Sequence, residues 1–533
     1  MRSQVRVRQI RRVLCVFPRY APSFGTFQHA YGLMHGVRAF MPPQGILLVA
    51  AYFPEAWEVR FVDENIAPAP EEDIAWADVL LVSGMHVQKD AINAVARRAR
   101  ALGKTTVLGG PSVSAAPEQY PDFDYLHLGE IGDATDDLIR ALDADASPPP
   151  AQRRFVTAER LPLADFPIPA YRLIDGSRYF LGSIQFSSGC PYRCEFCDIP
   201  ALYGRQPRLK TPEQVVAELD ALVAAGIQGS IYFVDDNFIG NKRATRNLLP
   251  HLIDWQKRRG YPLQLSCEAT LNIAKSPDIL AMMREAYFCT VFCGIETPEL
   301  GALGAMQKSH NSVMPLLEAL ETINSFGIEV VSGIILGLDT DTAATAGHLA
   351  EFIDRSRIPV LTINLLQALP KTPLWERLER DGRLIEDPQR ESNVAFARPY
   401  AEVLEDWHRS IRHAYTPEAI YSRFAWHGEH TYPNRITPPL SRARVNLPNL
   451  RRGLIILAKL FLRIGVQSDY RPVFWRMAIE ALRRGRIEEL IQVALISHHM
   501  ITFARECAEG RQNAAFFAQR SKAAPDMATA LPG

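Results

Sequence analysis

The chain has 533 residues, of which 47% are hydrophobic and 22% charged. At roughly 100–200 residues per domain this length predicts about three domains, and the composition excludes a disordered chain, a collagen-like repeat and a disulfide mini-protein. Lys plus Arg number 59 and Asp plus Glu also number 59, so the formal net charge is zero. A protein that binds nucleic acid over its whole surface needs a positive field, so we expect no nucleic-acid partner.

Cysteine usage and apolar stretches predict the compartment. Eight cysteines are too few here for a disulfide framework, and three of them fall within eight residues, which is typical of a reducing compartment. The apolar run at the basic N-terminus is too short for a signal peptide, and residues 454–466 fall short of the ~18 that a spanning helix needs. We therefore expect a cytoplasmic protein.

Residues 11–142 alternate short apolar β-type runs with helical periodicity, the pattern of a doubly wound parallel sheet. A helix is expected over residues 90–102. A linker rich in proline and small residues follows at 143–154. Residues 1–150 are therefore predicted to form an α/β domain of the Rossmann type. The predicted strands are 12–17, 58–63, 79–83 and 105–108.

Six further β-type runs separated by helical patterns follow from residue 183. Thr211, Pro212 and Gln214 predict the capped start of the first helix, and Gly226 its end. Six units are fewer than the eight of a closed barrel, so residues 151–400 are predicted to form a partial (β/α)6 barrel. Residues 401–533 lose the strand rhythm and are expected to be a helical C-terminal region. The six predicted strands are 183–187, 230–234, 263–267, 290–295, 329–335 and 360–366.

A three-cysteine motif follows the first predicted barrel strand. Cys190, Cys194 and Cys197 have the spacing Cys-x3-Cys-x2-Cys, and Phe196 precedes the last of them. Three thiolates can bind three irons of a 4Fe–4S cluster and leave the fourth iron open to a substrate or cofactor. The alternative, a structural zinc site, needs a fourth Cys or His nearby, and none follows closely. The spacing predicts a reactive cluster, and the other five cysteines are expected to pack in the interior.

This motif, with Phe196 before its last cysteine, resembles the cluster loop of the radical S-adenosylmethionine superfamily. The resemblance implies a partial (β/α)6 barrel in which the open iron binds the amino and carboxylate groups of S-adenosylmethionine. It also implies that an electron from the cluster cleaves S-adenosylmethionine into methionine and a 5′-deoxyadenosyl radical. An electron donor such as a ferredoxin or flavodoxin is the implied partner.

Polar and glycine-rich segments end later barrel strands, on the side of the barrel where the cluster loop is expected. The resemblance implies that the segment after the second strand binds the methionine ammonium or the ribose. It implies that a glutamate ending the fourth strand contacts the sugar or the amino acid, and that a glycine stretch on the fifth contacts the adenine. These residues are Asp235, Asp236, Asn237, Glu296, Gly333 and Gly337.

The first domain resembles the cobalamin-binding domain found in one branch of that superfamily, which mostly methylates unactivated carbons. The Asp-x-His-x-x-Gly signature that supplies a histidine to cobalt is missing from the sequence, although many members of the branch bind cobalamin without it. Because ligands bind at strand ends in open sheets, the expected contacts to the corrin and its tail are Ser83, Gly84, Gly109, Gly110 and Glu130.

Segments 17–18, 23–29 and 40–45, together with the helical C-terminal region, resemble the bacterial hopanoid C-2 methylases. That resemblance implies methylation of ring A of a pentacyclic hopanoid lipid. The deoxyadenosyl radical would remove hydrogen from a saturated carbon, methylcobalamin would supply the methyl group, and a second S-adenosylmethionine would remethylate cobalt. Two alternatives keep the radical chemistry: a tetrapyrrole (bacteriochlorophyll side-chain) methylase and an oxidative cyclase. An alternative of another class is a non-catalytic iron–sulfur sensor or binding protein.

Residues 441–487 are strongly basic, because eleven Lys and Arg side chains oppose only Asp469 and Glu480 and leave a net charge of +9. Apolar residues such as Leu454 and Trp475 are interleaved with these cations. The pattern fits contact with an anionic membrane that contains a lipid substrate. A solvated basic helix face packed on the barrel explains it equally well.

Overall fold

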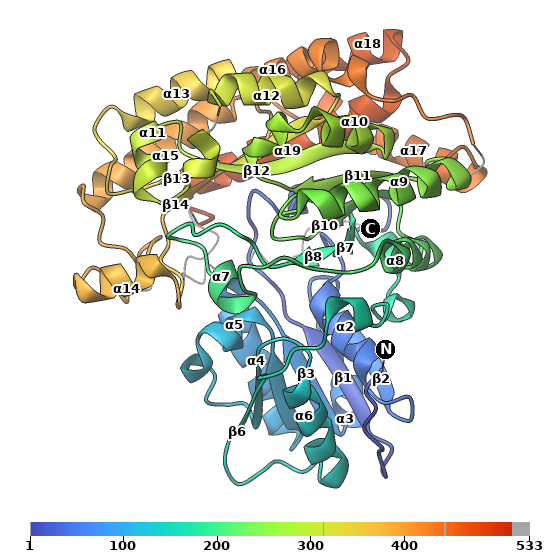
Figure 1. The fold of residues 1–533 in the computed structure, drawn as a ribbon. Helices are drawn as coiled ribbons and strands as arrows, with labels where there is room; N and C mark the ends of the chain where they lie inside the picture. Colours follow the sequence, from blue (N-terminus) through green and yellow to red (C-terminus); the bar gives the residue numbers. More distant parts are fainter. Residues whose placement is uncertain (1, 313, 388, 442–443, 514–533) are drawn as a thin grey trace.

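A six-stranded parallel sheet forms the first part of the molecule in this computed structural model, which describes residues 2–312, 314–387, 389–441 and 444–513 (Figure 1). The strand order is β2-β1-β3-β4-β5-β6. All four predicted strands are confirmed to within one residue, because buried parallel strands are continuous apolar runs. The strands are β1 (Arg12–Phe17), β2 (Glu58–Asp63), β3 (Val79–Ser83), β4 (Thr105–Gly109), β5 (Tyr125–Leu128) and β6 (Arg153–Val156).

Helices cover both faces of this sheet, as expected for a doubly wound fold. Side chains of β1 alternate between two apolar cores: Val13 packs with residues of α2 and α6, and Leu14 packs with residues of α3, α4 and α5. The predicted helix 90–102 is observed as α4. The helices are α1 (Gln28–Tyr31), α2 (Gln44–Tyr52), α3 (Glu71–Trp76), α4 (Lys89–Ala101), α5 (Pro111–Ala115) and α6 (Asp133–Ala144).

The linker between the two sheets differs from the expected segment 143–154. Helix α6 continues to Ala144, and β6 begins at Arg153 and pairs in parallel with β5. The first sheet therefore extends beyond residue 150. The sequence does not predict β6, because this edge strand begins with two exposed arginines and lacks an apolar run.

The second sheet has the order β14-β13-β12-β11-β10-β7, and every neighbouring pair is parallel. Its six strands match the six predicted units of a partial barrel. The first is shorter than expected: after Ile184 the chain leaves the sheet, and Ser187 and Ser188 pair with residues 208–209 instead. The strands are β7 (Gly182–Ile184), β8 (Ser187–Ser188), β9 (Arg208–Leu209), β10 (Gly229–Phe233), β11 (Leu263–Glu268), β12 (Phe288–Glu296), β13 (Glu329–Leu336) and β14 (Leu361–Leu365).

Helices connect the barrel strands. Thr211 caps α8 by accepting from the Gln214 amide, and the Gln214 side chain accepts from the Thr211 amide, so the predicted capping box is confirmed. The helices are α7 (Ile199–Leu202), α8 (Pro212–Ala224), α9 (Lys242–Arg259), α10 (Pro277–Glu285), α11 (Leu300–Ala305), α12 (Leu316–Ser325), α13 (Thr345–Ser356) and α14 (Pro373–Arg380).

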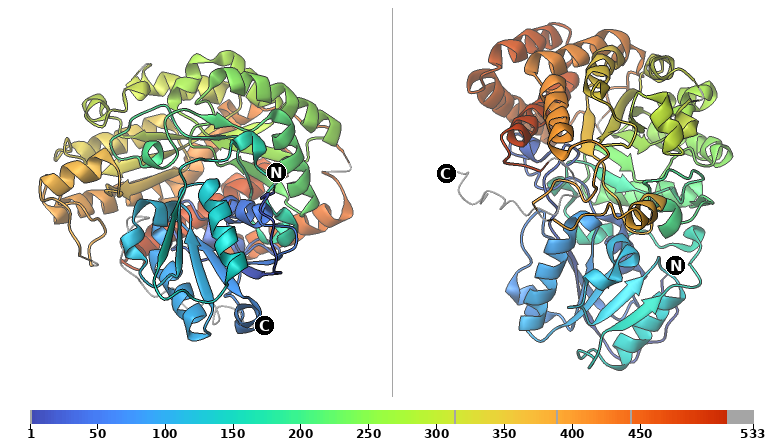
Figure 2. Two further views of the ribbon diagram at one scale, coloured as in Figure 1. Left: turned by 60° about the horizontal axis from the view of Figure 1, so that its bottom comes forward. Right: turned by 90° about the vertical axis from the view of Figure 1, so that its left-hand side faces the viewer.

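The C-terminal region is helical, as predicted, and packs along one side of the barrel (Figure 2). Its core is continuous with that of the barrel. Among the described residues, no helix is long and apolar enough to cross a bilayer. The expected helical stretch beyond residue 513 lies outside the described part. The helices are α15 (Tyr400–Ala414), α16 (Pro417–His430), α17 (Leu447–Leu460), α18 (Arg471–Arg483) and α19 (Ile487–Ala508), with a π-helical turn at Phe461–Val466.

Candidate active site

A cavity of about 880 Å³ lies between the carboxyl ends of the two sheets. Ser83, Gly84 and Glu130 line it from the first sheet, and Glu296 and Gly333 line it from the barrel. Parallel sheets bind ligands at this edge, and pockets of about 300–1,000 Å³ hold ligands of cofactor size. The fold therefore directs the binding edges of both sheets into one shared space.

The cluster loop, residues 186–198, begins where the chain leaves β7. The carboxylate of Asp235 accepts from the backbone amides of Phe186 (3.0 Å) and Ser187 (2.5 Å), and Asp236 accepts from the amide of Gly189 (2.6 Å). Burial raises the pKa of Asp235 to about 6 and that of Asp236 to about 7. These two carboxylates at the end of β10 hold the base of the loop.

The three thiols of the loop are partly buried and lie near one another. Burial raises the pKa of each thiol above its ordinary value, and the ammonium of Lys308 opposes this at Cys190 and Cys194. In the described ranges, no group of three or more His, Cys, Asp or Glu side chains is placed to hold a single metal ion. A 4Fe–4S cluster distributes three thiolates over three irons, which fits this donor set.

A buried ion pair adjoins the loop. The Lys308 ammonium donates to the Glu296 carboxylate, and it lies 5.5 Å from the centre of the Phe196 ring. Glu296 ends β12 with a φ of 66°, and a side chain at Gly294 would collide with both partners. Breaking a buried pair leaves an uncompensated charge, so the geometry keeps one cation fixed beside the cysteines.

Several buried side-chain atoms around the loop have no nitrogen or oxygen partner among the described residues. His310 stacks on Tyr192 with ring centres 3.7 Å apart, and its Nε2 has no hydrogen-bond partner among the described residues. The side-chain oxygen of Asn311 also has no hydrogen-bond partner among the described residues. Both side-chain amide atoms of Asn237 lack a nitrogen or oxygen partner among those residues. Burial lowers the pKa of His310 to about 4. Buried polar atoms are normally satisfied, so these atoms can bind a polar ligand, while the Asn311 amide nitrogen already donates to the Gly294 backbone oxygen.

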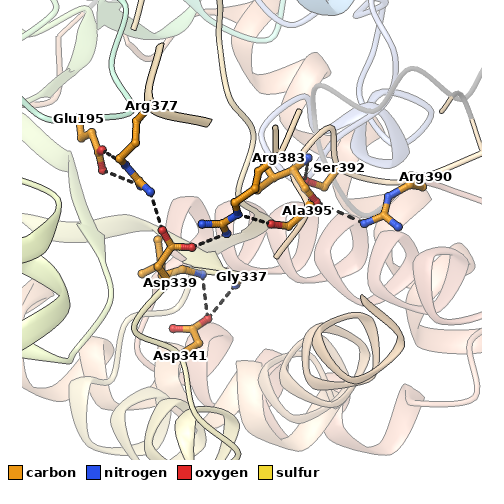
Figure 3. Close-up of polar contacts among 11 residues, drawn as sticks. Glu195, Gly337, Asp339, Asp341, Arg377, Arg383, Arg390, Ser392 and Ala395 are labelled. Atoms are coloured by element: carbon orange, nitrogen blue, oxygen red, sulfur yellow. Dashed lines mark hydrogen bonds and ion pairs between the residues drawn. The ribbon is translucent and has the colours of Figure 1, made fainter. Parts of the chain in front are cut away.

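A chain of ion pairs ties the far side of the cluster loop to α14 (Figure 3). The Arg377 guanidinium donates to both carboxylate oxygens of Glu195 (2.6 and 3.3 Å) and to Asp339 (2.7 Å). Arg383 donates to the other oxygen of Asp339 (2.6 Å). Bidentate arginine–carboxylate pairs are strong and directional, so Glu195, between two of the cysteines, is held in one orientation.

The glycines at the first sheet serve close packing at the cavity wall. Gly110 has a φ of 99°, and a Cβ there would lie 2.6 Å from the Ser83 hydroxyl, so only glycine fits. Glu130 accepts from Arg208 (2.6 Å) and lies 3.1 Å from Arg160. These ion pairs connect the first sheet to the segments around the barrel entrance.

Two histidines lie near this edge. His127 lines the cavity, and its Nε2 hydrogen-bonds to Thr135 at 2.8 Å, while burial lowers its pKa to about 4. His86 lies near Ser112 and Asp198 and is not among the cavity-lining residues. The His127 Nε2 is thus engaged by the chain's own hydroxyl group.

Most of the predicted site residues meet at the cavity. The cysteines lie on the cluster loop, whose Phe196 lines the cavity, and neither they nor Asp235, Asn237 and Gly337 are among its lining residues. Gly337 has a φ of 91°, and its amide donates to Asp341 (2.7 Å), so it forms a turn after β13. The predicted residues that line the cavity are Phe196, Asp236, Glu296, Gly333, Ser83, Gly84, Gly109, Gly110 and Glu130.

The sequence did not reveal Lys308, His310, Asn311 and Arg377. All except Arg377 follow α11 in a polar segment of the kind that usually lies in solvent. Only their burial against the cluster loop distinguishes them. The other five cysteines, Cys15, Cys267, Cys289, Cys293 and Cys507, are buried as expected.

Two family models match the parts that form the cavity. A B12 binding domain matches residues 32–139, and the Radical SAM superfamily matches residues 184–353. A domain of unknown function, DUF4070, matches residues 372–513. The matches define the class of protein as a cobalamin-binding radical S-adenosylmethionine enzyme, and the expected cofactors are those of this class: a 4Fe–4S cluster, S-adenosylmethionine and cobalamin.

The fold is shared with solved structures. The enzyme OxsB with aqua-cobalamin and S-adenosylmethionine bound has a TM-score of 0.56 at 14% identity, over 95% of this chain and 81% of that one. The methyltransferase TsrM from Kitasatospora setae, with cobalamin and a 4Fe–4S cluster bound, has a TM-score of 0.54 at 18% identity, over 71% of this chain and 80% of that one.

A curated relative is much more similar in sequence. The hopanoid C-2 methylase of Rhodopseudomonas palustris is 57% identical over 514 residues, which cover 96% of this chain and 97% of the relative. This chain belongs to the same family of cobalamin-dependent radical S-adenosylmethionine methyltransferases.

Proposed function

We propose that this enzyme methylates C-2 in ring A of a bacterial hopanoid lipid. The observation that carries the proposal is the 57% identity to the hopanoid C-2 methylase over nearly the full length of both chains. The cavity agrees with an apolar substrate, because segments 23–26 and 40–45, which lie within the stretches that resemble those methylases, form part of its wall. Phe24, Phe40 and Met41 are among these lining residues.

We assign the cofactors to the two halves of the cavity. Cys190, Cys194 and Cys197 would hold three irons of the cluster, with Asp235 and Asp236 fixing the loop beneath them. The side chains of Phe196, Asn237, Glu296 and the strand around Gly333 and Gly337 would surround S-adenosylmethionine. The glycine edge of the first sheet, which is Ser83, Gly84, Gly109, Gly110 and Glu130, would support cobalamin.

The saturated ring carbon has no acidic proton, so a general base has no use in this site. Bound together, the cofactors supply a radical that removes the hydrogen atom and a methyl group that replaces it. The protein contributes the shape of the cavity and an apolar wall that excludes water. Phe292, Gly333 and Ile335 line the barrel side of the cavity, and Thr362 and Asn364 add polar groups there. Such a wall orients an apolar ring system and excludes water.

The proposed setting follows from the substrate and the cluster. A 4Fe–4S centre must be reduced before each reaction, so we propose an electron donor such as a ferredoxin or flavodoxin as a partner. Hopanoids are lipids, so we place the enzyme in the cytoplasm, peripherally at the inner face of the membrane. The eight free cysteines agree with a reducing compartment.

Anaerobic reconstitution with iron, sulfide, cobalamin and a chemical reductant tests the function. With S-adenosylmethionine and a hopanoid in detergent, we expect 5′-deoxyadenosine and a 2-methylated product by mass spectrometry. Cys194→Ala should lose both products, because one iron loses its ligand, while Cys15→Ala in β1 should keep both. Release of 5′-deoxyadenosine with methylation of a tetrapyrrole, or with a cyclised product, would transfer the assignment to those alternatives. A loaded wild-type protein that never cleaves S-adenosylmethionine would be a sensor.

A further inference from the structure

An exposed apolar stripe runs along α17 and the π-helical turn that follows it. Leu447, Leu450, Leu454, Leu462 and Val466 are each 58–77% exposed. Their spacing of three, four, eight and four residues places them on one face of the helix. The opposite face is buried in the core through Ile456, Leu460 and Ile464. The helix is therefore apolar on the side that faces solvent as well as on the side that faces the protein.

This concentration of exposed apolar side chains is unusual for the molecule. Ten of the seventeen large apolar side chains found exposed in the described chain lie between residues 440 and 487. The remaining ones outside the stripe lie before α17 (Leu440, Val445) and on and after α18 (Ile479, Leu482, Ile487). Both helices lie at the edge of the helical region, away from the first sheet (Figure 1). Large apolar patches on a soluble surface mark binding sites for proteins or membranes.

The positive charge of this region favours a membrane over a protein as the binding partner. Arg451, Arg471, Arg476 and Arg483 are exposed and form no ion pair within the described ranges, whereas Asp469 and Glu480 are paired with Arg505 and Arg484. Arg442, another cation of the basic stretch, lies outside the described residues. The basic segment that contains the stripe thus exposes positive charge that no carboxylate pairs with in the described part of the chain. An apolar helix face bordered by arginines is the pattern of a helix that lies in the interface of an anionic bilayer.

Helix α17, which carries the stripe, contacts the N-terminal segment that forms part of the wall of the active-site cavity. The Lys459 ammonium, on α17, donates to the backbone oxygens of Gly32 (3.1 Å) and Met34 (3.2 Å). From α19, the His499 ring nitrogen lies 3.2 Å from the backbone oxygen of Phe24. The N-terminal segment that these helices contact supplies Phe24, Thr26 and Phe40 to the cavity. A bilayer in contact with α17 would therefore lie next to the segment that encloses the substrate.

We propose that the α17 stripe is a membrane-docking surface, with its leucines among the lipid headgroups and the surrounding arginines on lipid phosphates. This surface lies within residues 372–513, which match the domain of unknown function. Its role rests on the proposed function, because a lipid substrate explains why the enzyme would dock, but the surface itself binds lipid without a hopanoid. Docking would bring the cavity close to the lipid bilayer that contains the substrate.

Vesicle flotation of the full-length protein tests the proposal. We expect binding to vesicles of phosphatidylglycerol and phosphatidylcholine (3:7) that contain no hopanoid, and much weaker binding to pure phosphatidylcholine. The triple variant Leu450→Gln/Leu454→Gln/Leu462→Gln should lower the partition coefficient at least tenfold. A matched control, Leu102→Gln/Val223→Gln/Leu300→Gln, removes three exposed apolar side chains elsewhere and should bind as the wild type does.

A second variant set addresses the charges. Arg451→Gln/Arg471→Gln/Arg476→Gln should remove most of the preference for phosphatidylglycerol and most of the dependence on salt. Circular dichroism must show that each variant keeps its helices. Equal binding of the leucine variant and the wild type would overturn the proposal. So would a dimer of the wild type that the leucine variant converts to a monomer, because a second copy would then cover the stripe.

The two proposals fail in different ways. If the leucine variant methylates a detergent-solubilised hopanoid at the wild-type rate but loses activity on hopanoid in vesicles, both stand. If the wild type binds vesicles through the stripe yet methylates no hopanoid, the docking surface stands and the substrate assignment falls. If methylation in vesicles continues unchanged in the leucine variant, the substrate stands and the docking surface is wrong.

Discussion

Single side chains around the cavity carry its electrostatics. Lys308 and Glu296 form a buried pair beside the cluster loop, and His127 lines the opposite wall in its neutral form. A buried imidazole that is held neutral resists protonation because the charged form would lose its hydration. The first sheet therefore contains a group whose titration opposes folding in acid.

Acidification should destabilise the protein through His127. Its folded-state pKa of about 4 lies below the ordinary value near 6.5, so the unfolded chain binds more protons between these values. The free energy of unfolding then falls as the pH drops through this window, by about 2 kcal/mol between pH 7.5 and pH 5. Urea unfolding at the two pH values should show that His127→Gln removes this amount of the wild-type pH dependence. The exposed His35→Gln should retain it, and an identical pH dependence in His127→Gln would contradict the assignment.

Individual elements act as supports for the cluster loop. Helix α14 follows the last barrel strand, and its Arg377 reaches the glutamate between two cluster cysteines. The end of β10 supports the same loop from the other side through Asp235 and Asp236. The loop is thus fixed between the end of a barrel strand and the helix that follows the last barrel strand.

Removing the α14 support should loosen the cluster without unfolding the chain. Arg377→Gln deletes charge-assisted hydrogen bonds that are each worth about 1–3 kcal/mol. We expect iron loss to a chelator, followed by the decay of cluster absorbance, to be at least tenfold faster than in the wild type. Arg380→Gln lies on the same helix with an exposed side chain and should release iron at the wild-type rate. Unchanged iron release by the Arg377 variant would show that the loop does not need this support.

The molecule as a whole positions one cavity by stacking two parallel sheets with their carboxyl ends facing each other. The Glu130–Arg208 ion pair crosses from the first sheet to the barrel side, and Arg160, which bridges to Gly132 of the first domain, donates to the backbone oxygens of Leu202 and Tyr203. The Lys371 ammonium also donates to the backbone oxygen of Ser114 at 2.5 Å. These contacts fix the distance between the site proposed for cobalamin and the site proposed for S-adenosylmethionine.

Loosening this junction should weaken cobalamin binding. Glu130→Gln leaves the partly buried Arg208 and the more exposed Arg160 without a carboxylate, a cost of about 1–3 kcal/mol that corresponds to about a fivefold to 150-fold loss of affinity. Absorbance titration with cobalamin measures the affinity, and limited proteolysis between the sheets reports the mobility. The exposed Glu159→Gln nearby is the control, with the affinity of the wild type expected. If Glu130→Gln binds cobalamin normally and resists protease, the junction does not depend on this residue.

Much of the architecture was predictable from the sequence. Both parallel sheets were found because their strands are buried on both faces and appear as apolar runs such as those of β1 and β3. The short edge strand β6 was missed because its residues are mostly polar and exposed. The first barrel strand ends earlier than predicted, because the amides of Phe186 and Ser187 donate to the carboxylate of Asp235, which lies far along the chain.

By itself, the sequence determined the chemistry: three cysteines at a fixed local spacing define a cluster site, since their ligand geometry depends on one loop. Only the tertiary structure decided which side chains surround that loop. Lys308, Arg377 and the outward leucines of α17 carry no local pattern that distinguishes a buried support or a docking face from ordinary helix and loop surface. Their roles depend on burial, exposure and long-range contact, which exist only after distant segments pack together.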